Sequence, residues 1–180
     1  AQHPATKHLF IVDSVFNLPK VHAKEVCREL IKRGWDIPWT CYINPLGFDL
    51  DTAQLLKSAG CVGIEIGSDS GSERVLSGLK KGFKVKQIRD LAALAQAAGI
   101  KDCHSFILGT PGETLADVEE SLGLIDELKP FCAILGVWMD DFEALDPALA
   151  ESRRAFRDEI KARVADFSRT RPFCVVPSLK

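Results

Sequence analysis

Small polar residues follow directly on a β-branched run at residues 64–76, where the sequence is IEIGSDSGSERVL. Glu65, Ser68, Asp69 and Ser70 supply carboxylates and hydroxyls, and the glycines between them let a ligand approach the backbone closely. Polar, aromatic or glycine-rich residues also end four other apolar runs, namely Asp13, Ser14 and Asn17; Asn44; GTPGET at 109–114; and Trp138, Asp140 and Asp141. Ligands of parallel α/β proteins bind at the carboxyl ends of strands, so this pattern predicts a binding site.

Each of these features also has a purely structural explanation. Ser70 or Ser72, with the glutamate that follows, could cap the next helix, and Thr114 could cap the helix after the GTPGET turn. The acids at 140–141 are typical of solvated loop residues before a helix. Glu65 alternates with two isoleucines, which suits either a side chain that faces the ligand or an ion pair that faces a helix.

The cysteines and histidines do not have the spacing of a metal site. The six cysteines are Cys27, Cys41, Cys61, Cys103, Cys132 and Cys174. The closest two are separated by 14 positions, so no Cys-x-x-Cys pair exists, and we expect buried structural thiols rather than disulfides. No two of the four histidines have ligand spacing, so no histidine metal site is predicted.

Short apolar runs alternate with amphipathic segments along the chain. The runs at 8–13, 39–44, 61–67, 102–109 and 132–138 predict five strands, and the segments between them have helical periodicity. Regular alternation predicts an α/β fold with a parallel sheet wound right-handedly. A last helix is expected at about 146–168, because Asp146 and Pro147 form a start signal, and an extended tail follows it. We expect a single domain over residues 1–180.

Composition narrows the possible partners and the compartment. The net charge is -2 and basic residues do not cluster, so neither a nucleic acid nor a membrane surface is an expected partner. The apolar runs are too short to span a bilayer, and the first residues do not have the apolar core of a signal peptide. The expected location is the cytoplasm.

Three blocks of the sequence resemble the radical S-adenosylmethionine (radical SAM) superfamily. They are LFIVDSVFN at 9–17, AGCVGIEIGSDSGSERVLSGLKKGF at 59–83 and AAGIKDCHSFILGTPGETLADVEESL at 97–122. The resemblance is greatest to the Fe-S oxidoreductase subgroup, which often carries an upstream cobalamin-binding domain. It implies an incomplete TIM-like (βα)6 partial barrel with five of its six strands present, the second to the sixth, plus a C-terminal helix.

The resemblance also implies where S-adenosylmethionine would lie. Asp13 or Ser14 would hold the methionine amino group, and the polar end of the strand at 64–72 would contact the ribose or the methionine part. The backbone of Ile107, Leu108 and Gly109 would lie against the adenine. The implied cofactor-binding residues are therefore Asp13, Ser14, Asn44, Glu65, Ser68, Asp69, Ser70, Ile107, Leu108 and Gly109. No catalytic residue and no metal ligand is implied within the chain.

The chain departs from the family pattern at three places. Ser68 and Asp69 stand where relatives usually have Glu, and the last predicted strand lacks a proline-rich turn. The Cys-x-x-x-Cys-x-x-Cys loop that holds the family's [4Fe-4S] cluster does not occur. We therefore expect a fragment that is without the first strand and the cluster loop and is inactive by itself. Its parent enzyme would reductively cleave S-adenosylmethionine. In the subgroup with the upstream domain, the parent would also use cobalamin.

Two other functions stay open at this stage. One is a non-catalytic, degenerate barrel that binds a ligand or a partner through the same strand ends. The other is a conventional αβ-barrel lyase with Asp13, Glu65 or Asp69 as general base, for which the chain is short. The substrate cannot be inferred from the sequence. Self-association is expected through the exposed edge of the strand at 8–13, because an unpaired strand edge invites pairing.

Overall fold

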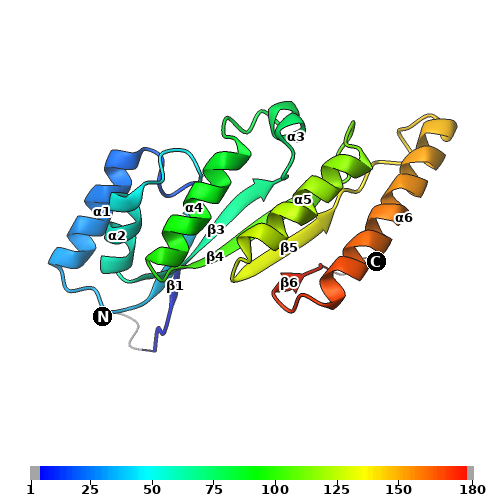
Figure 1. Ribbon diagram of the computed structural model, residues 1–180. Coiled ribbons are helices and arrows are strands. Elements are labelled where there is room, and N and C mark those ends of the chain that lie inside the picture. The colour runs from blue at the N-terminus through cyan, green and yellow to red at the C-terminus, as the bar shows by residue number, and fades with distance from the viewer. Residues whose placement is uncertain (1–4, 178–180) are drawn as a thin grey trace. The chain divides into compact units, whose positions relative to one another are not determined.

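Six strands form one sheet in the computed structural model, which describes residues 5–177. They are β1 (Leu9–Ile11), β2 (Trp39–Ile43), β3 (Cys61–Asp69), β4 (Lys101–Leu108), β5 (Cys132–Val137) and β6 (Cys174–Val175), and they follow one another in the sheet in chain order (Figure 1). The pairs β1–β2, β2–β3 and β5–β6 are parallel. This arrangement confirms the predicted α/β class with parallel strands.

Six helices connect or follow these strands. They are α1 (Lys20–Lys32), α2 (Leu50–Ser58), α3 (Glu73–Gly78), α4 (Val85–Ala97), α5 (Leu115–Leu128) and α6 (Pro147–Arg169). No helix in the described part of the chain is both long enough and apolar enough to cross a membrane.

The sixth strand was not expected from the sequence. Residues after α6 were expected to form only an extended tail, but Cys174 and Val175 pair with Ala133 and Ile134 of β5. The strand is only two residues long and lies at the end of the strand order. Pro172 precedes the paired residues, so its missing N–H removes no hydrogen bond from this strand.

The chain divides into two compact units. Unit 1 comprises residues 1–67 and 86–104, and unit 2 comprises residues 68–85 and 105–180. β3 and β4 each contribute residues to both units. The single domain expected from the sequence stays a prediction, and the two units are described in turn.

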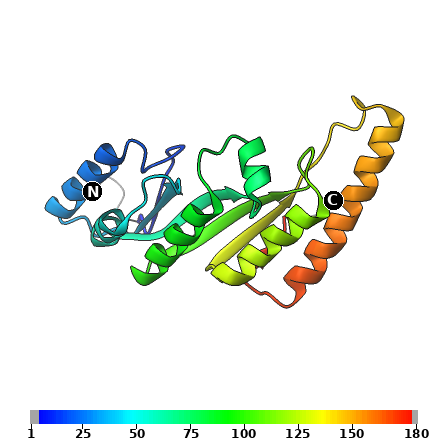
Figure 2. The same ribbon diagram turned by 45° about the horizontal axis from the view of Figure 1, so that its top comes forward.

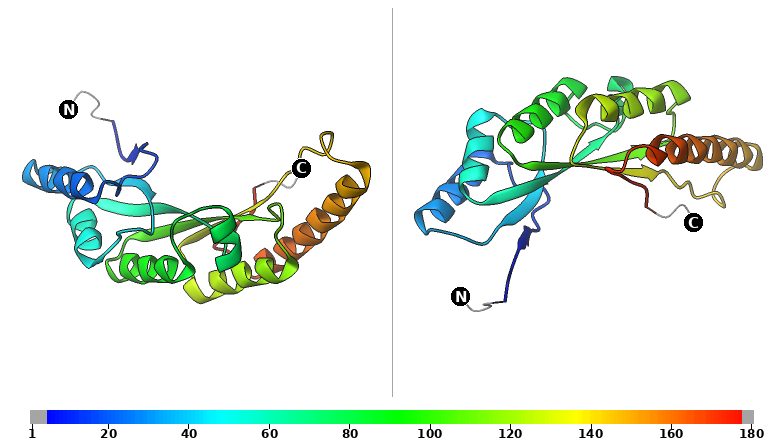
Figure 3. Two further views of the ribbon diagram at one scale, coloured as in Figure 1. Left: turned by 90° about the horizontal axis from the view of Figure 1, so that it is seen from above. Right: turned by 60° about the horizontal axis from the view of Figure 1, so that its bottom comes forward.

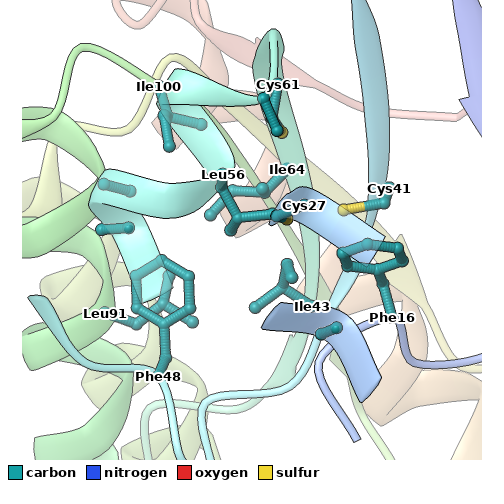
Figure 4. Packing of buried hydrophobic residues seen from close by; sticks show 14 of the residues in the cluster. Phe16, Cys27, Cys41, Ile43, Phe48, Leu56, Cys61, Ile64, Leu91 and Ile100 are labelled. Carbon is teal, nitrogen blue, oxygen red and sulfur yellow. The ribbon is translucent and has the colours of Figure 1, made fainter. Parts of the chain in front are cut away.

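Unit 1 is built around one apolar core. Helices α1, α2 and α4 lie beside the strands of this unit (Figure 3). They contribute buried side chains such as Cys27, Leu56 and Leu91, which pack with β2 and β3 residues such as Ile43 and Ile64 (Figure 4). Alternate residues of β2 are buried, as expected for a strand with helices on one face. The fully buried indole of Trp39 donates its N–H to the carbonyl of Ala59 at 2.7 Å, so its polar atom is satisfied inside the core.

Local signals in the sequence set the helix starts. Asp49 caps α2 by accepting a hydrogen bond from the Thr52 backbone N–H at 2.8 Å. In unit 2, Thr114 caps α5, as the sequence allowed, and Asp117 completes a reciprocal capping box with it. Asp146 caps α6, and Pro147 is its first residue.

In unit 2 the long helix α6 packs against both α5 and β5 (Figure 2). The apolar side chains of α6 are buried only in part: Ile160 and Val164 are inaccessible to solvent, whereas Leu149 near the start of the helix is 50% exposed. The first turns of α6 thus carry fewer apolar contacts than the later ones. Arg153 in the second turn instead makes polar contacts, which are described below.

Candidate functional site

At the strand ends of unit 1, some polar side chains make no hydrogen bond within residues 5–177 and others stabilise the local turn. Asp13 and Ser14, just beyond β1, are exposed, and neither side chain has a hydrogen-bond partner within residues 5–177. Asn44, just beyond β2, is half-buried, and its side-chain oxygen accepts the backbone N–H of Leu46 at 2.8 Å. The first two side chains are therefore available to a ligand, whereas the Asn44 side chain also shapes its own turn.

The turn after β2 is held by a buried asparagine that was noted in the sequence but not assigned to the cofactor. The Asn17 amide donates to the carbonyls of Asn44 and Leu46 at 2.8 and 3.2 Å, and its side-chain oxygen accepts the Asn44 N–H at 2.8 Å. Asn17 is completely buried. These bonds join the ends of β1 and β2 within unit 1, so Asn17 positions Asn44.

Glu65 lies on the less covered face of β3. It pairs in register with Tyr42, which is 39% exposed, while its neighbours Ile64 and Ile66 are buried against the helices. Phe10 contacts Tyr42 edge to face, with ring centroids 5.0 Å apart. Of the two orientations that the sequence allowed for Glu65, the structure has the one directed away from the helices of unit 1.

Beyond Gly67 the chain enters unit 2, and the loop of small residues contacts α5. The hydroxyls of Ser70 and Ser121 lie 3.1 Å apart, and the backbone N–H of Gly71 donates to the Ser121 hydroxyl at 2.8 Å. The Ser72 hydroxyl donates to Asp117 at 2.6 Å. The hydroxyls of Ser70 and Ser72 are thus engaged with α5, and Ser72 precedes α3 without making a side-chain cap.

Asp69 has a different environment from the serines beside it. Its φ of +59° lies in the left-handed region, and its carboxylate pairs with Lys81, which follows α3. Ser68 next to it is completely buried. The Asp69 side chain is 13% exposed and that of Lys81 is 27% exposed, so this loop holds a mostly buried carboxylate and an ammonium group close together.

Asp117 is the centre of the polar network between α3 and α5. It accepts hydrogen bonds from Ser72, Thr114 and Arg74, and it is almost fully buried. Burial by itself would raise the pKa of this carboxyl, but the hydrogen bonds from Arg74, Ser72 and Thr114 outweigh burial and hold the pKa well below its usual range. Asp117 is therefore a structural anion that joins the two helices.

A buried glutamate holds the turn between β4 and α5. One carboxylate oxygen of Glu113 accepts the backbone N–H groups of Gly109 and Thr110, both at 2.8 Å, and the Thr110 hydroxyl at 2.9 Å. The other oxygen is buried without a hydrogen-bond partner within residues 5–177. Burial raises the pKa of Glu113 despite these hydrogen bonds. The sequence GTPGE therefore encodes a turn that its own last residue fixes.

The backbone of Ile107, Leu108 and Gly109 is held by these and further contacts. The Leu108 carbonyl accepts the Trp138 N–H at 2.8 Å, and the Gly109 carbonyl accepts a guanidinium N–H of Arg153 at 2.5 Å. Leu108 is completely buried, whereas Ile107 is half-buried on the opposite face of β4. The backbone segment expected to face a ligand is thus rigidly positioned within unit 2.

The thiols of the chain do not fit an iron-sulfur cluster. Within residues 5–177 no three His, Cys, Asp or Glu side chains are grouped as metal ligands, and Cys27, Cys41 and Cys61 are buried as free thiols. Burial raises the pKa of Cys27 to about 12. The hydrogen bond with Cys61, together with burial, raises the pKa of Cys41. These three are buried thiols, as the sequence predicted, whereas Cys103, Cys132 and Cys174 are only half-buried, so for them the prediction of buried thiols was wrong.

Comparison with known proteins identifies the family. The model of the radical SAM superfamily matches residues 1–125, which is more than half of the chain. The chain belongs to the radical SAM superfamily. Its resemblance to this family and its fold class are thereby confirmed.

Two radical SAM relatives of this chain are methyltransferases by name. An uncharacterized methyltransferase of Pyrococcus horikoshii is 30% identical over 122 residues, 68% of this chain and 27% of the relative. Tryptophan 2-C-methyltransferase of Streptomyces laurentii is 31% identical over 159 residues, 79% of this chain and 26% of the relative. The chain thus spans about a quarter of the length of these relatives.

A solved radical SAM structure has the same fold. The radical SAM methyltransferase TsrM from Kitasatospora setae, with cobalamin and a [4Fe-4S] cluster bound, matches with a TM-score of 0.68 and 29% identity. The match covers 73% of this chain and 27% of TsrM. The cofactors expected for the parent enzyme are thus those found in this relative.

Two residues of the radical SAM chain that contact predicted site residues were missed by the sequence analysis. Lys81 pairs with Asp69 from 12 positions away, and Arg153 binds the Gly109 carbonyl from 44 positions away. No local pattern signals either contact. Asp140 was expected to be a solvated loop acid, but its carboxylate is 9% exposed and pairs with Arg153 at 2.9 Å, so that expectation was wrong.

Proposed function

We propose that this chain supplies part of the S-adenosylmethionine site of a radical SAM enzyme that transfers a methyl group. The similarity to two methyltransferases over 68% and 79% of the chain supports methyl transfer, whereas the substrate class is left open. The main observation behind the proposed cofactor site is the way in which Gly109 is held. Its N–H donates to the buried Glu113, and its carbonyl accepts from Arg153, whose side chain is nearly buried. A backbone fixed in this way is preorganised for a planar ligand.

In unit 1, taken by itself, the available groups suit an ammonium group such as that of methionine. Asp13 and Ser14 are exposed acceptors for an ammonium group, and Asn44 lies at the end of the neighbouring strand. Glu65 lies on the less covered face of β3 with Tyr42 beside it. The ligand's charged and hydroxyl groups need such partners, because a buried polar group without a hydrogen bond is costly.

In unit 2 we propose two contacts of different kinds. The Asp69 carboxylate and the Lys81 ammonium offer an acceptor for ribose hydroxyls and a donor for a carboxylate. Ile107, Leu108 and Gly109 offer backbone and the half-buried Ile107 side chain for the adenine ring. Ser68 and Ser70 remain predicted contacts through their backbone, since the Ser70 hydroxyl bonds to Ser121 and Ser68 is completely buried.

The iron-sulfur chemistry has no ligand set in this chain. In the parent enzyme a [4Fe-4S] cluster would supply the electron that cleaves S-adenosylmethionine, and the family's cysteine triplet does not occur in the sequence. We therefore assign these residues to cofactor binding and orientation alone.

Binding of S-adenosylmethionine to the ¹⁵N-labelled chain, followed by NMR, tests this proposal. Saturable shifts of the Gly109 and Thr110 amides are expected. The variant Asp69→Asn should weaken binding, whereas the matched control Asp51→Asn, which changes an exposed acid of α2, should not. No saturable shift up to about 1 mM, where binding energy is only about 4 kcal/mol, would overturn the proposal and leave the non-catalytic module as the better account.

Two further properties belong to this proposal. We propose self-association through β1, because β1 stands at the end of the strand order of residues 5–177 and both Leu9 and Phe10 are 36% exposed. Light scattering that finds only monomer at high concentration would contradict it. We also propose a reducing compartment such as the cytoplasm, because the six cysteines are free thiols.

A further inference from the structure

Arg153 joins two segments that lie far from it in sequence. One guanidinium N–H donates to the Gly109 carbonyl at 2.5 Å, and the Nε–H donates to the Asp140 carboxylate at 2.9 Å. The side chains of Arg153 and Asp140 are only 15% and 9% exposed. A charge-assisted hydrogen bond that is shielded from water holds its geometry better than a surface ion pair.

The same two segments are also joined without Arg153. The Trp138 indole N–H donates to the second Asp140 oxygen at 3.2 Å, and the Trp138 backbone N–H donates to the Leu108 carbonyl at 2.8 Å. The contacts therefore form a closed ring through Leu108, Gly109, Arg153, Asp140 and Trp138. All five residues belong to unit 2.

Gly109 is the member of this ring with least freedom. Its φ is +86°, in the region that favours glycine, and a Cβ atom there would lie 2.8 Å from the Ile160 side chain. Its N–H is held by Glu113 and its carbonyl by Arg153. Removal of Arg153 would release the Gly109 carbonyl and leave the turn to the Glu113 and Trp138 contacts, so the whole turn should open more often.

We propose that Arg153 is a positioning residue, which orients the Gly109 peptide and ties it to Trp138 so that a ligand lying against Ile107–Gly109 is bound by a preorganised backbone. The inference rests on the proposed cofactor site. It predicts that Arg153 affects ligand affinity more than it affects the stability of the chain. It also predicts that ligand binding changes the environment of Trp138, which is 38% exposed.

Three variants separate this role from a general contribution of α6. Arg153→Met keeps an unbranched side-chain stem and removes both hydrogen bonds, while Arg153→Lys keeps the charge but not the two-pronged geometry. Arg154→Met is the matched control. Arg154 is the next residue of α6, and its guanidinium lies 4.9 Å from the centre of the Phe142 phenyl ring, so it takes no part in the hydrogen bonds around Gly109. Each variant is measured in the full chain.

The first measurement needs no ligand. Hydrogen exchange of the Gly109 and Trp138 amides should be faster by about tenfold in Arg153→Met, as expected for the loss of one charged hydrogen bond, and unchanged in Arg154→Met. The amides of β2 in unit 1 should exchange at the wild-type rate in both. Equal exchange at Gly109 in the two variants would overturn the proposal.

The second measurement is the affinity for S-adenosylmethionine by calorimetry, together with Trp fluorescence. Arg153→Met should bind about tenfold more weakly, with Arg153→Lys between it and the wild type. A lower melting temperature with an unchanged dissociation constant would show a merely structural role and refute the inference. Failure of the wild type to bind S-adenosylmethionine would instead overturn the proposed function. Hydrogen exchange would then still test whether Arg153 holds the Gly109 turn in place.

Discussion

Replacement of Gly71 by alanine should disrupt the packing of the small-residue loop on α5. A Cβ atom at this position would lie 2.6 Å from the Glu120 carbonyl oxygen and 2.7 Å from the Ser121 Cα. Both are backbone atoms of a helix, so no side chain can rotate away to make room. The loop must move, and this movement breaks the 2.8 Å hydrogen bond from the Gly71 N–H to the Ser121 hydroxyl.

The expected cost follows from these contacts. Overpacking of this kind costs about 1–3 kcal/mol and the lost hydrogen bond about 1 kcal/mol. The φ of Gly71 is not positive, so the backbone tolerates alanine at this position. Alanine also reduces the conformational entropy of the unfolded chain, which offsets about 0.4–1 kcal/mol of the cost. The free energy of unfolding should therefore fall by about 1–3.5 kcal/mol.

Urea unfolding followed by circular dichroism measures this change. The matched control is Gly123→Ala, which makes the same substitution within α5, where a Cβ would meet nothing within 4 Å. That variant should be more stable than the wild type by about 0.5–1 kcal/mol, because alanine favours the helix. A Gly71→Ala protein within about 0.5 kcal/mol of the wild type would refute the packing argument, since surface substitutions fall in that range.

Three further predictions concern buried polar groups. The lowered pKa of Asp117 means that wild-type stability falls as the pH drops below about 4, so Asp117→Asn should show a shallower fall in acid unfolding, and parallel curves would contradict this. The raised pKa of Glu113 has the opposite sign: stability falls as the pH rises through that pKa, and Glu113→Gln should abolish this loss, so an unchanged slope would refute it. Asn17→Ala removes three hydrogen bonds and should cost about 2–4 kcal/mol in urea unfolding, whereas a cost below about 1 kcal/mol would exclude its positioning role.

Sequence patterns were sufficient for most of the fold. The five expected strands and the helices between them correspond to β1–β5 and α1–α5, because apolar periodicity and capping residues act over a few positions. Thr114 and Asp146 cap α5 and α6 as their sequences indicate. The short β6 was missed because two residues carry no periodicity, and its pairing depends on β5 about 40 positions away.

The candidate site was predicted less completely. The strand-end rule located Asp69 and Gly109, but it could not tell that the Ser70 hydroxyl would bond to α5 while Asp69 would pair with Lys81. Neighbouring residues of an extended segment point to opposite faces, and the sequence does not say which face a helix will cover. Arg153 carried no signal at all, since its partners lie 13 and 44 positions away.

The sequence by itself determined the α/β class, the membership of the family that its motifs resemble and the positions of the polar strand ends. These depend on local preferences and on motif spacing, which the chain carries in every conformation. Only the tertiary structure decided which polar groups are available to a ligand and which are used to hold a turn or join two helices. The reason is that a hydrogen bond between groups such as Arg153 and Gly109 exists only after packing has excluded water and brought distant segments within 3 Å of each other.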